Sequence, residues 1–204
     1  MSKAILYLIL FIPIFIRAQG VRPDFAQQFY EIHTYTTKDG LSQVSINDIE
    51  KDDEGFLWIA TQSGLNRFDG TSFYTFDNIE PNGKYINVLL PDHNRIWIGS
   101  RARGLSYFDK KTHSFHNIEA MQSVNIDDMV MDSMQHLYVT LENKGIGFIR
   151  KDKKTGNFHL WVFPFFGNKN ITVTAVFISG SGTLWVGTKE GRLFYGEIKK
   201  IPKK

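Results

Sequence analysis

Cysteine is absent from the 204 residues, and proline is scarce, with 6 residues. The lack of cysteine excludes a disulfide framework, a thiolate metal site and a cysteine nucleophile. The chain is instead rich in glycine and phenylalanine, with 17 of each. This composition is typical of many short strands that are joined by tight turns and packed through aromatic side chains.

The chain also has no large excess of charge of either sign. The formal net charge is +3, but two of the 24 basic residues, Lys3 and Arg17, lie in the leader described below. The remaining 22 basic residues are almost balanced in number by 21 acidic residues. Four of the 22 are lysines in a basic tail over residues 199–204. We therefore expect no nucleic-acid partner, because domains that bind DNA or RNA carry a clear basic excess.

Long apolar runs are missing after the N-terminus. Residues 4–16 contain no charge, Lys3 precedes them, and the small residues Ala18 and Gly20 follow. This order is typical of a secretory signal peptide over residues 1–20. The run is shorter than the roughly 20 residues that cross a membrane; a short uncleaved anchor or a buried strand is the alternative. We expect a periplasmic protein with no membrane span in the mature chain.

One short sequence motif recurs four times along the chain. In each copy an aromatic residue sits inside a short apolar run, and a glycine follows six or seven residues later. The aromatic residues are 39, 41 and 47 residues apart, a period near 40 that is typical of propeller blades. These repeat anchors are Trp58, Trp97, Tyr138 and Trp185, followed by Gly64, Gly104, Gly145 and Gly191.

The hydrophobic period within each repeat is two, with turn residues between the runs, which predicts antiparallel strands. We therefore predict an all-β fold, a partial or small β-propeller of about four four-stranded antiparallel blades. The blades lie within residues 28–198, at about 40–79, 80–118, 119–163 and 168–198. The last repeat ends without an outer strand. Residues 28–36 are predicted to be an orphan outer strand that completes it and removes the exposed edge.

The recurring residues have structural roles. The anchor side chains supply wide apolar faces that pack one blade against the next. The small residue two positions after each anchor, such as Ala60 or Gly99, suits close approach between blades. The glycine opens the third strand, where a tight turn requires a positive φ.

The repeats resemble the two-component regulator propeller repeat. The matching segments of the first copy are Gly40–Ser42, Ile46–Ile49, Asp53–Thr61 and Gly64–Gly70, and weaker copies continue to about residue 198. The resemblance implies the periplasmic sensor part of a hybrid two-component histidine kinase of Bacteroidetes. In that family a seven-bladed ring, usually two in tandem, precedes a membrane helix, a kinase and a DNA-binding output. Many of these sensors detect oligosaccharides released from polysaccharides.

This chain has about four blades where the family has seven, and it has no kinase segment. We therefore expect an N-terminal fragment of such a sensor. The alternative is a stand-alone four-bladed ring, which is within the range of about four to eight blades that propellers show.

Motifs for catalysis or metal binding are weak. His113 and His116 are three residues apart, which places them on opposite faces of a strand. Residues 52–54 (Asp-Asp-Glu) lack the alternating ligands of a calcium loop and coincide with an expected hairpin turn. The sequence has no phosphate-binding loop and no nucleophile elbow. We expect no metal, no cofactor and no enzymatic activity, although paired carboxylates for glycoside chemistry cannot be identified from spacing alone.

The candidate ligand surface follows from topology. In a propeller the turns between second and third strands gather at one end. Their arginines and lysines could form a basic rim for a carboxylated or sulfated sugar, because guanidinium groups bind such anions bidentately. Solvated loop charges that balance one another are the alternative. The candidate residues are Gln62, Arg101, Arg103, Glu142, Asn143, Lys144, Lys189 and Glu190.

The expected function is a periplasmic ligand-sensing module of a two-component system that binds an oligosaccharide-type signal. Two alternatives are a protein–protein interaction scaffold in the cell envelope and a propeller lyase or glycosidase. Besides the oligosaccharide, the expected partner is a second copy of the chain or the missing remainder of the propeller. Sugar binding without turnover favours the sensor over both alternatives.

Overall fold

A computed structural model describes residues 31–76, 85–152, 154–163 and 171–197. The chain divides into two compact units, Met1–Thr34 and Tyr35–Lys204. Of the first unit only residues 31–34 are described, without regular secondary structure, so the predicted signal peptide lies outside the described residues. Among the described residues, no helix combines the length and the apolar character needed to cross a membrane.

The described part of the second unit forms fifteen strands in four antiparallel sheets, each with its strands in chain order. The first sheet has β1 (Ile46–Lys51), β2 (Leu57–Thr61), β3 (Gly64–Phe68) and β4 (Phe73–Phe76). The second has β5 (Ile86–Pro91), β6 (Arg95–Ser100), β7 (Gly104–Asp109) and β8 (Ser114–Asn117). The third has β9 (Met129–Met131), β10 (Leu137–Leu141), β11 (Gly145–Lys151) and β12 (Phe158–Phe163). The fourth has β13 (Val173–Ile178), β14 (Thr183–Thr188) and β15 (Leu193–Glu197).

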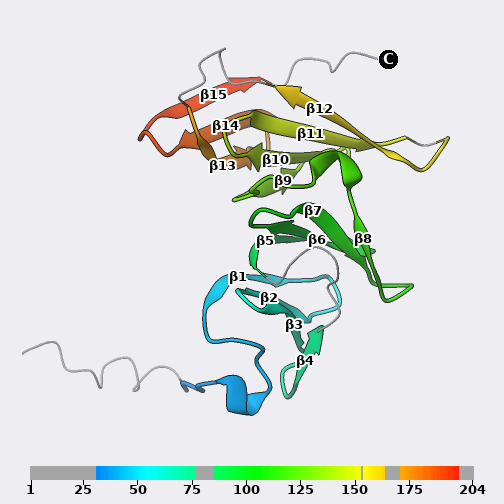
Figure 1. The fold of residues 1–204 in the computed structure, drawn as a ribbon, viewed down its shortest axis with the longest axis vertical. Coiled ribbons are helices and arrows are strands. Elements are labelled where there is room, and N and C mark those ends of the chain that lie inside the picture. Colours follow the sequence, from blue (N-terminus) through cyan, green and yellow to red (C-terminus); the bar gives the residue numbers. More distant parts are fainter. Residues whose placement is uncertain (1–30, 77–84, 153, 164–170, 198–204) are drawn as a thin grey trace, which may run out of the picture. The chain divides into compact units, whose positions relative to one another are not determined.

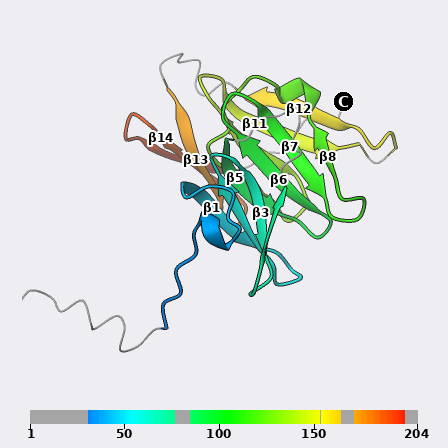
Figure 2. The same ribbon diagram turned by 60° about the horizontal axis from the view of Figure 1, so that its bottom comes forward.

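The four sheets follow one another in chain order, with the first strands β1, β5, β9 and β13 next to each other (Figure 1). In the turned view the outer strands β8 and β12 lie on the side away from β1, β5 and β13 (Figure 2). Two short 3₁₀ helices, Thr37–Asp39 and Glu119–Met121, lie before the first and third sheets. The predicted all-β propeller-blade fold is confirmed.

The predicted strand over residues 28–36 falls partly outside the described residues. Its described part, residues 31–36, has no strand, and within the described residues the fourth sheet has three strands. The predicted basic tail over 199–204 also lies outside the described residues.

Each sheet packs one face against the next sheet. We call the face that carries the repeat anchor the anchor face, and the opposite face the back face. Hydrophobic clusters join each of the first three anchor faces to the back face of the following sheet. The anchor-face members are Trp58, Ala60 and Leu65; Trp97 and Leu105; and Tyr138, Ile146 and Phe148. Their back-face partners are Leu89, Ile96, Ile98 and Phe108; Leu137, Val139 and Ile149; and Val176 and Val186.

Polar side chains on the first strands also join neighbouring sheets. A register shift at Asn47, and another at Asn87, inserts one extra residue in the strand and turns its carboxamide toward the next sheet. Asn47 Nδ2 donates to the Ile86 carbonyl at 2.6 Å, and Asn87 Nδ2 donates to the Ile126 carbonyl at 3.0 Å. We call these side chains, together with the two aspartates described next, the forward hooks.

Two aspartates also bind the next sheet, but their carboxylates accept hydrogen bonds from its backbone N–H groups. Asp48 Oδ2 accepts from the Leu89 N–H at 2.7 Å, and Asp128 Oδ2 accepts from the Val176 N–H at 2.8 Å. In every case the hook side chain belongs to the earlier sheet and its partner to the next one. The hooks therefore fix how far one sheet can slide along its neighbour.

An aspartate at the start of the first hairpin turn holds the repeat anchor in place. Asp52 Oδ1 accepts from the N–H groups of Glu54 and Phe56, while its Oδ2 accepts from Trp58 Nε1 at 2.8 Å. Asp92 binds Trp97 Nε1 in the same way at 2.9 Å, and Asp132 binds the Tyr138 hydroxyl at 3.4 Å. In the fourth sheet Ser179 takes this place and accepts from the Thr183 N–H. The sequence pattern predicts a turn at residues 52–54 but gives no sign of the hydrogen bond between Asp52 and Trp58.

Glycine is required for close approach at Gly99, as the sequence predicted. A Cβ there would lie 2.6 Å from Val88 Cγ1 and 2.7 Å from Ile126 Cγ2. The glycines that open the third strands have the predicted positive φ, for example 134° at Gly64 and 79° at Gly104. A Cβ at Gly104 would also collide with the Met121 carbonyl.

We predict that Gly99→Ala destabilises the fold by about 1–3 kcal/mol, because the added methyl group overpacks the gap between the second and third sheets. Gly180→Ala is the matched control, since nothing lies within 4 Å of a Cβ at Gly180. Urea denaturation measures both free energies of unfolding. Equal effects of the two substitutions would contradict the close approach.

A second prediction concerns the Asp128 hook. Burial raises the pKa of its carboxyl, and the hydrogen bonds from the N–H groups of Val176 and Met129 oppose that shift only in part. Asp128→Ala leaves the buried Val176 N–H without its acceptor and should cost about 1–3 kcal/mol. Asp128→Asn keeps an acceptor oxygen and removes the buried charge, so its cost at pH 7 should be smaller.

The pH dependence follows from the direction of this shift. A carboxyl with a raised pKa in the folded state binds its proton more tightly there, so stability falls as pH rises from the unfolded pKa through the folded pKa. The wild type should therefore lose stability relative to Asp128→Asn over that interval, measured by urea denaturation at several pH values. A constant difference would contradict the assignment.

Candidate functional site

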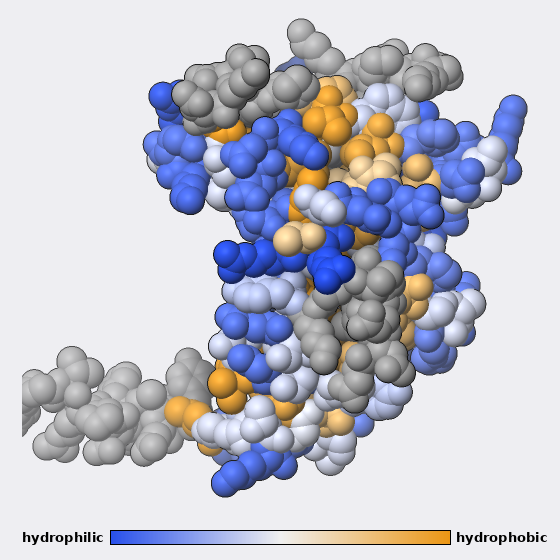
Figure 3. Space-filling view, viewed as in Figure 1, coloured by the Kyte–Doolittle hydropathy of each residue, from blue (hydrophilic) through white to orange (hydrophobic). Residues whose placement is uncertain are grey.

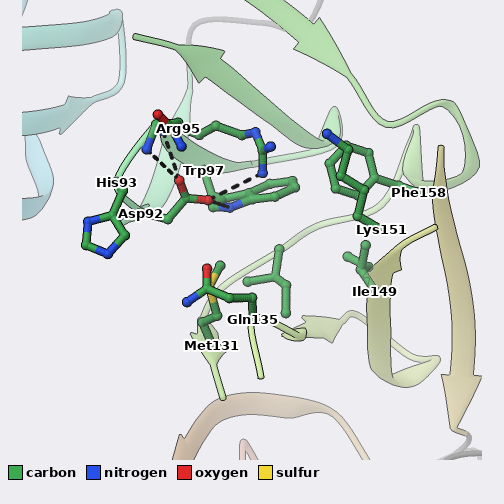
Figure 4. A pocket seen from close by; sticks show the side chains of 11 residues that line it. Asp92, His93, Arg95, Trp97, Met131, Gln135, Ile149, Lys151 and Phe158 are labelled. Atoms are coloured by element: carbon green, nitrogen blue, oxygen red, sulfur yellow. Dashed lines mark hydrogen bonds and ion pairs between the residues drawn. The ribbon is translucent and has the colours of Figure 1, made fainter. Parts of the chain in front are cut away.

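A pocket with mixed polar and aromatic lining lies between the second and third sheets (Figure 4). It is at the end of the sheets that holds the turns between first and second strands, which we call the first-turn end. Its volume is about 240 Å³. The lining comes from the β5–β6 turn, β6, the β9–β10 turn, β10, β11 and β12. The lining residues are Asp92, His93, Asn94, Arg95, Trp97, Met131, Gln135, Leu137, Ile149, Lys151 and Phe158.

Arg95 and two aromatic rings form one wall of the pocket. Arg95 Nη1 lies 3.5 Å from Asp92 Oδ2, which also accepts from Trp97 Nε1. The guanidinium carbon is 5.7 Å from the Phe158 ring centre and 5.8 Å from the Trp97 ring centre, within cation–π range. Trp97 and Phe158 meet edge to face at 5.3 Å. These contacts hold the wall together, and its one carboxylate, that of Asp92, is already paired with Arg95.

Lys151 and Gln135 supply the exposed polar groups of the pocket. Lys151 Nζ lies 5.8 Å from the Phe158 ring centre, and among the described residues no carboxylate pairs with it. Gln135 is exposed in the β9–β10 turn, on the opposite side of the pocket from Arg95 (Figure 4). The pocket is thus lined by the ammonium group of Lys151, the carboxamide of Gln135 and the aromatic ring of Phe158.

Gln135 has an unfavourable backbone conformation. Its φ is 65°, in the left-handed region, whereas glycine takes the corresponding turn position in the first and fourth sheets, with φ of 96° at Gly55 and 83° at Gly182. A residue with a Cβ costs about 1–2 kcal/mol in that region. Gln135 therefore has a strained backbone at a position where glycine would fit without strain. Such backbone strain is a sign of a functional constraint.

A second hollow adjoins this pocket at the first-turn end. It has a volume of about 220 Å³ and shares Asp92, His93, Met131 and Gln135 with the pocket. Lys51, Asp53 and Pro91 complete its lining. The two hollows together extend the accessible space from the third sheet toward the first.

The acidic run at residues 52–54 lies near this end and is bound by a lysine. Lys110 Nζ is 2.9 Å from Asp53 Oδ1, 2.9 Å from Glu54 Oε1 and 3.4 Å from Asp52 Oδ2. Burial by itself lowers the pKa of Lys110, but its contacts with Glu54, Asp53 and Asp52 outweigh burial and raise it. Hydrogen bonds from His93 and Lys110 lower the pKa of Asp53 to about 2. The ammonium group thus lies within 3.4 Å of one oxygen of each of the three carboxylates.

The residues predicted from topology lie at the opposite, second-turn end. Gln62 and Arg101 meet at Tyr85: Gln62 Nε2 donates to the Tyr85 hydroxyl at 3.2 Å, and the Arg101 guanidinium lies 5.4 Å from the Tyr85 ring centre. Arg103 and Lys144 are exposed in the β6–β7 and β10–β11 turns. The structure thus brings the first and second loops together.

The acidic and amide members of the predicted rim have local partners. Glu142 accepts from Asn125 Nδ2 at 2.5 Å, and Glu190 accepts from the Thr172 N–H at 3.1 Å. Asn143, with φ of 58°, accepts from the Thr172 hydroxyl at 3.4 Å. The contact between Asn143 and Thr172 joins the third loop to the fourth sheet's repeat, while the other two contacts lie each within one repeat.

Asp127 changes the charge of the predicted rim. Burial, and after it the charge of Glu142, raise the pKa of Asp127, while Arg101 and Lys189 oppose that shift. Two of the four predicted cations, Arg101 and Lys189, therefore lie close enough to act on a carboxylate outside the predicted rim. The arrangement is a mixed-charge cluster, and these residues stay a predicted binding surface.

The histidine pair has the predicted geometry. His113 packs against the Phe108 ring at 6.1 Å, and His116 stacks on the Tyr107 ring at 4.9 Å. Phe108 and Tyr107 are adjacent in β7 and point to opposite faces of the second sheet. The two imidazoles thus lie on different faces.

Comparison with known proteins supports the repeat assignment. Residues 40–63 match the family model of the two component regulator propeller. A stretch of 45 residues is 51% identical to Histidine kinase P4 of Formosa agariphila, and this match covers 22% of the chain and 3% of that kinase. The chain therefore matches a small part of a much longer relative.

Solved structures show the same fold. The extracellular domain of a hybrid two component system from B. thetaiotaomicron is 27% identical with a TM-score of 0.66, over 80% of this chain and 24% of that one. A second such domain from the same organism is 20% identical with a TM-score of 0.63, over 85% of this chain and 23% of that one. The chain spans about a quarter of the length of these domains. The chain thus carries a two component regulator propeller repeat at residues 40–63, and its fold is similar to that of the extracellular domains of hybrid two component systems.

Proposed function

We propose that this chain is an exported, non-enzymatic sensor domain that binds an oligosaccharide in the pocket between the second and third sheets. The similarity to extracellular domains of two component systems supports the sensing role. The observation that carries the site is Gln135. Its side chain lines the pocket, and its backbone has a strained, left-handed conformation that glycine would adopt without cost.

The chemistry of the lining favours a saccharide. Carboxamide and ammonium groups hydrogen-bond sugar hydroxyls, and an aromatic face such as that of Phe158 offers apolar surface to a sugar ring. Sites of this kind combine a largely apolar wall with a few placed polar groups. The pocket between the second and third sheets has that composition.

The charges of the pocket favour an acidic sugar. Asp92 is paired with Arg95, so Lys151 remains as a cation without a carboxylate partner among the described residues. A carboxylate or sulfate group on the ligand would provide that partner, with the energy of a charge-assisted hydrogen bond. The class of ligand is therefore the carboxylated or sulfated oligosaccharide that the predicted rim also implies.

The position of the pocket offers a route for the signal. Arg95 belongs to the second sheet and Lys151 to the third, so a ligand that contacts both groups stabilises one packing of the two sheets over others. A ligand can shift a conformational equilibrium only through such differential contacts. Binding would thus be reported as a change in sheet packing.

The test is a binding screen of the purified protein against uronic-acid and sulfated oligosaccharides, with neutral counterparts in parallel. We expect binding of an acidic member without formation of product, measured by calorimetry and by chromatography of the same samples. Lys151→Ala should weaken binding at least about tenfold, which corresponds to about 1.4 kcal/mol. Lys154→Ala is the matched control, an exposed lysine in the β11–β12 turn outside the pocket.

Gln135→Gly separates a functional from a structural role. We expect weaker binding of the same oligosaccharide together with unchanged or slightly higher stability, by up to about 1 kcal/mol, because the substitution removes the left-handed strain. Binding that survives both Lys151→Ala and Gln135→Gly would refute the pocket. If Arg101→Ala combined with Arg103→Ala abolishes binding instead, the ligand occupies the second-turn rim. Product formation would show an enzyme, and no binding to any member of the screen would contradict the proposed ligand class.

A further inference from the structure

The pocket of the proposed site and the hollow that adjoins it are both small. Their volumes are about 240 Å³ and about 220 Å³, whereas sites for organic ligands usually hold about 300–1,000 Å³. The two spaces are continuous, because they share the lining residues Asp92, His93, Met131 and Gln135. A ligand of ordinary size that enters the pocket therefore also fills the adjoining hollow. We call the two together the joined space.

Three sheets line the joined space. Lys51 ends β1 of the first sheet, His93 lies in the β5–β6 turn of the second, and Lys151 ends β11 of the third. His93 and Lys151 lie at opposite ends of the pocket (Figure 4). The adjoining hollow has His93 but not Lys151 in its lining, so it continues the pocket at the His93 end. Lys51 and Lys151 therefore lie at opposite ends of the joined space.

The two carboxylates of the lining are already bound. Asp53 Oδ2 lies 2.7 Å from His93 Nδ1, and Asp53 Oδ1 lies 2.9 Å from Lys110 Nζ. Asp92 Oδ2 lies 3.5 Å from Arg95 Nη1. Both carboxylates thus bind cations or imidazole at the middle of the joined space, and neither neutralises a lysine at its ends.

An ammonium group lies at each end of this space. Lys51 and Lys151 are both exposed and both line it. An ammonium group offers three hydrogen-bond donors and no acceptor, and its hydrogen bonds to anions are the strong, charge-assisted ones. The β11–β12 turn at the same end of the sheets is covered by hydrophilic residues (Figure 3). The joined space therefore suits a hydrophilic chain that carries an anionic group at each end.

We propose that the ligand is an acidic oligosaccharide of at least two units, which binds Lys151 through one carboxylate or sulfate group and Lys51 through a second. This inference rests on the proposed function, since it extends the same pocket and the same class of ligand. It makes Lys51 a specificity-determining residue that sets the minimum length of the ligand. An acid of a single unit fills one hollow and reaches one lysine.

Calorimetry of the purified protein with two series of oligosaccharides tests the proposal. The first series is galacturonic acid and its oligomers of two, three and four units. The second is sulfated κ-carrageenan oligosaccharides of two, four and six units. In at least one series the affinity should rise at least about tenfold with length and then level off, because a second charge-assisted hydrogen bond forms once the chain reaches both lysines.

Substitution of the two lysines separates the two ends. Lys51→Ala should lower the affinity for the longer members at least about tenfold and leave that of the shortest member unchanged, whereas Lys151→Ala should weaken both. Lys51→Arg keeps the charge and should keep most of the affinity. Lys38→Ala is the matched control, an exposed lysine in the 3₁₀ helix before the first sheet and outside the lining. Because Lys51 is exposed, the melting temperature of its variants should stay close to that of the wild type.

The outcomes distinguish this inference from the proposed function. If Lys151→Ala weakens binding but Lys51→Ala has no effect at any length, the ligand occupies the pocket alone, which overturns the two-ended site and leaves the proposed function intact. An affinity that does not depend on length has the same meaning. Binding that survives both substitutions would refute the pocket and its extension together, and no binding in either series would contradict the ligand class on which both depend.

Discussion

The packing of one anchor face onto the next back face is the contact on which the rest of the molecule depends. A small antiparallel sheet is only marginally stable by itself, because it needs an apolar partner for at least one face. The repeat anchors provide that partner, Gly99 lets two sheets approach closely, and the forward hooks fix their relative position. The pocket lies in one of these sheet junctions, so its shape depends on the same packing.

The repeat predicted the fold well because the anchors and glycines have direct geometric consequences. A wide aromatic face must be buried, and Gly64 and Gly104 have the positive φ that their turns require. The hooks were not predicted. The extra residue at Asn47 or Asn87 does not interrupt the alternating pattern visibly, and the pairing of Asp52 with Trp58 depends on the shape of the hairpin between them.

The candidate site was less predictable for a physical reason. Arg95 and Lys151 lie far apart in the sequence and meet only because the second and third sheets pack together. Gln135 gives no sequence signal either, since its left-handed conformation is known only from the backbone. Topology did place the second-turn loops at one end, and Gln62 and Arg101 do meet at Tyr85. It could not show that Asp127 faces two of the predicted cations.

The one-way direction of the forward hooks has a consequence for how the chain folds during synthesis. Each hook side chain emerges from the ribosome before the backbone group that it binds, because the N-terminal sheet is made first. Each of the first three sheets therefore carries an unsatisfied hook and an open apolar face until the next sheet is made. Order therefore spreads along the chain from the N-terminal sheet, and each sheet is held in place by the sheet that follows it.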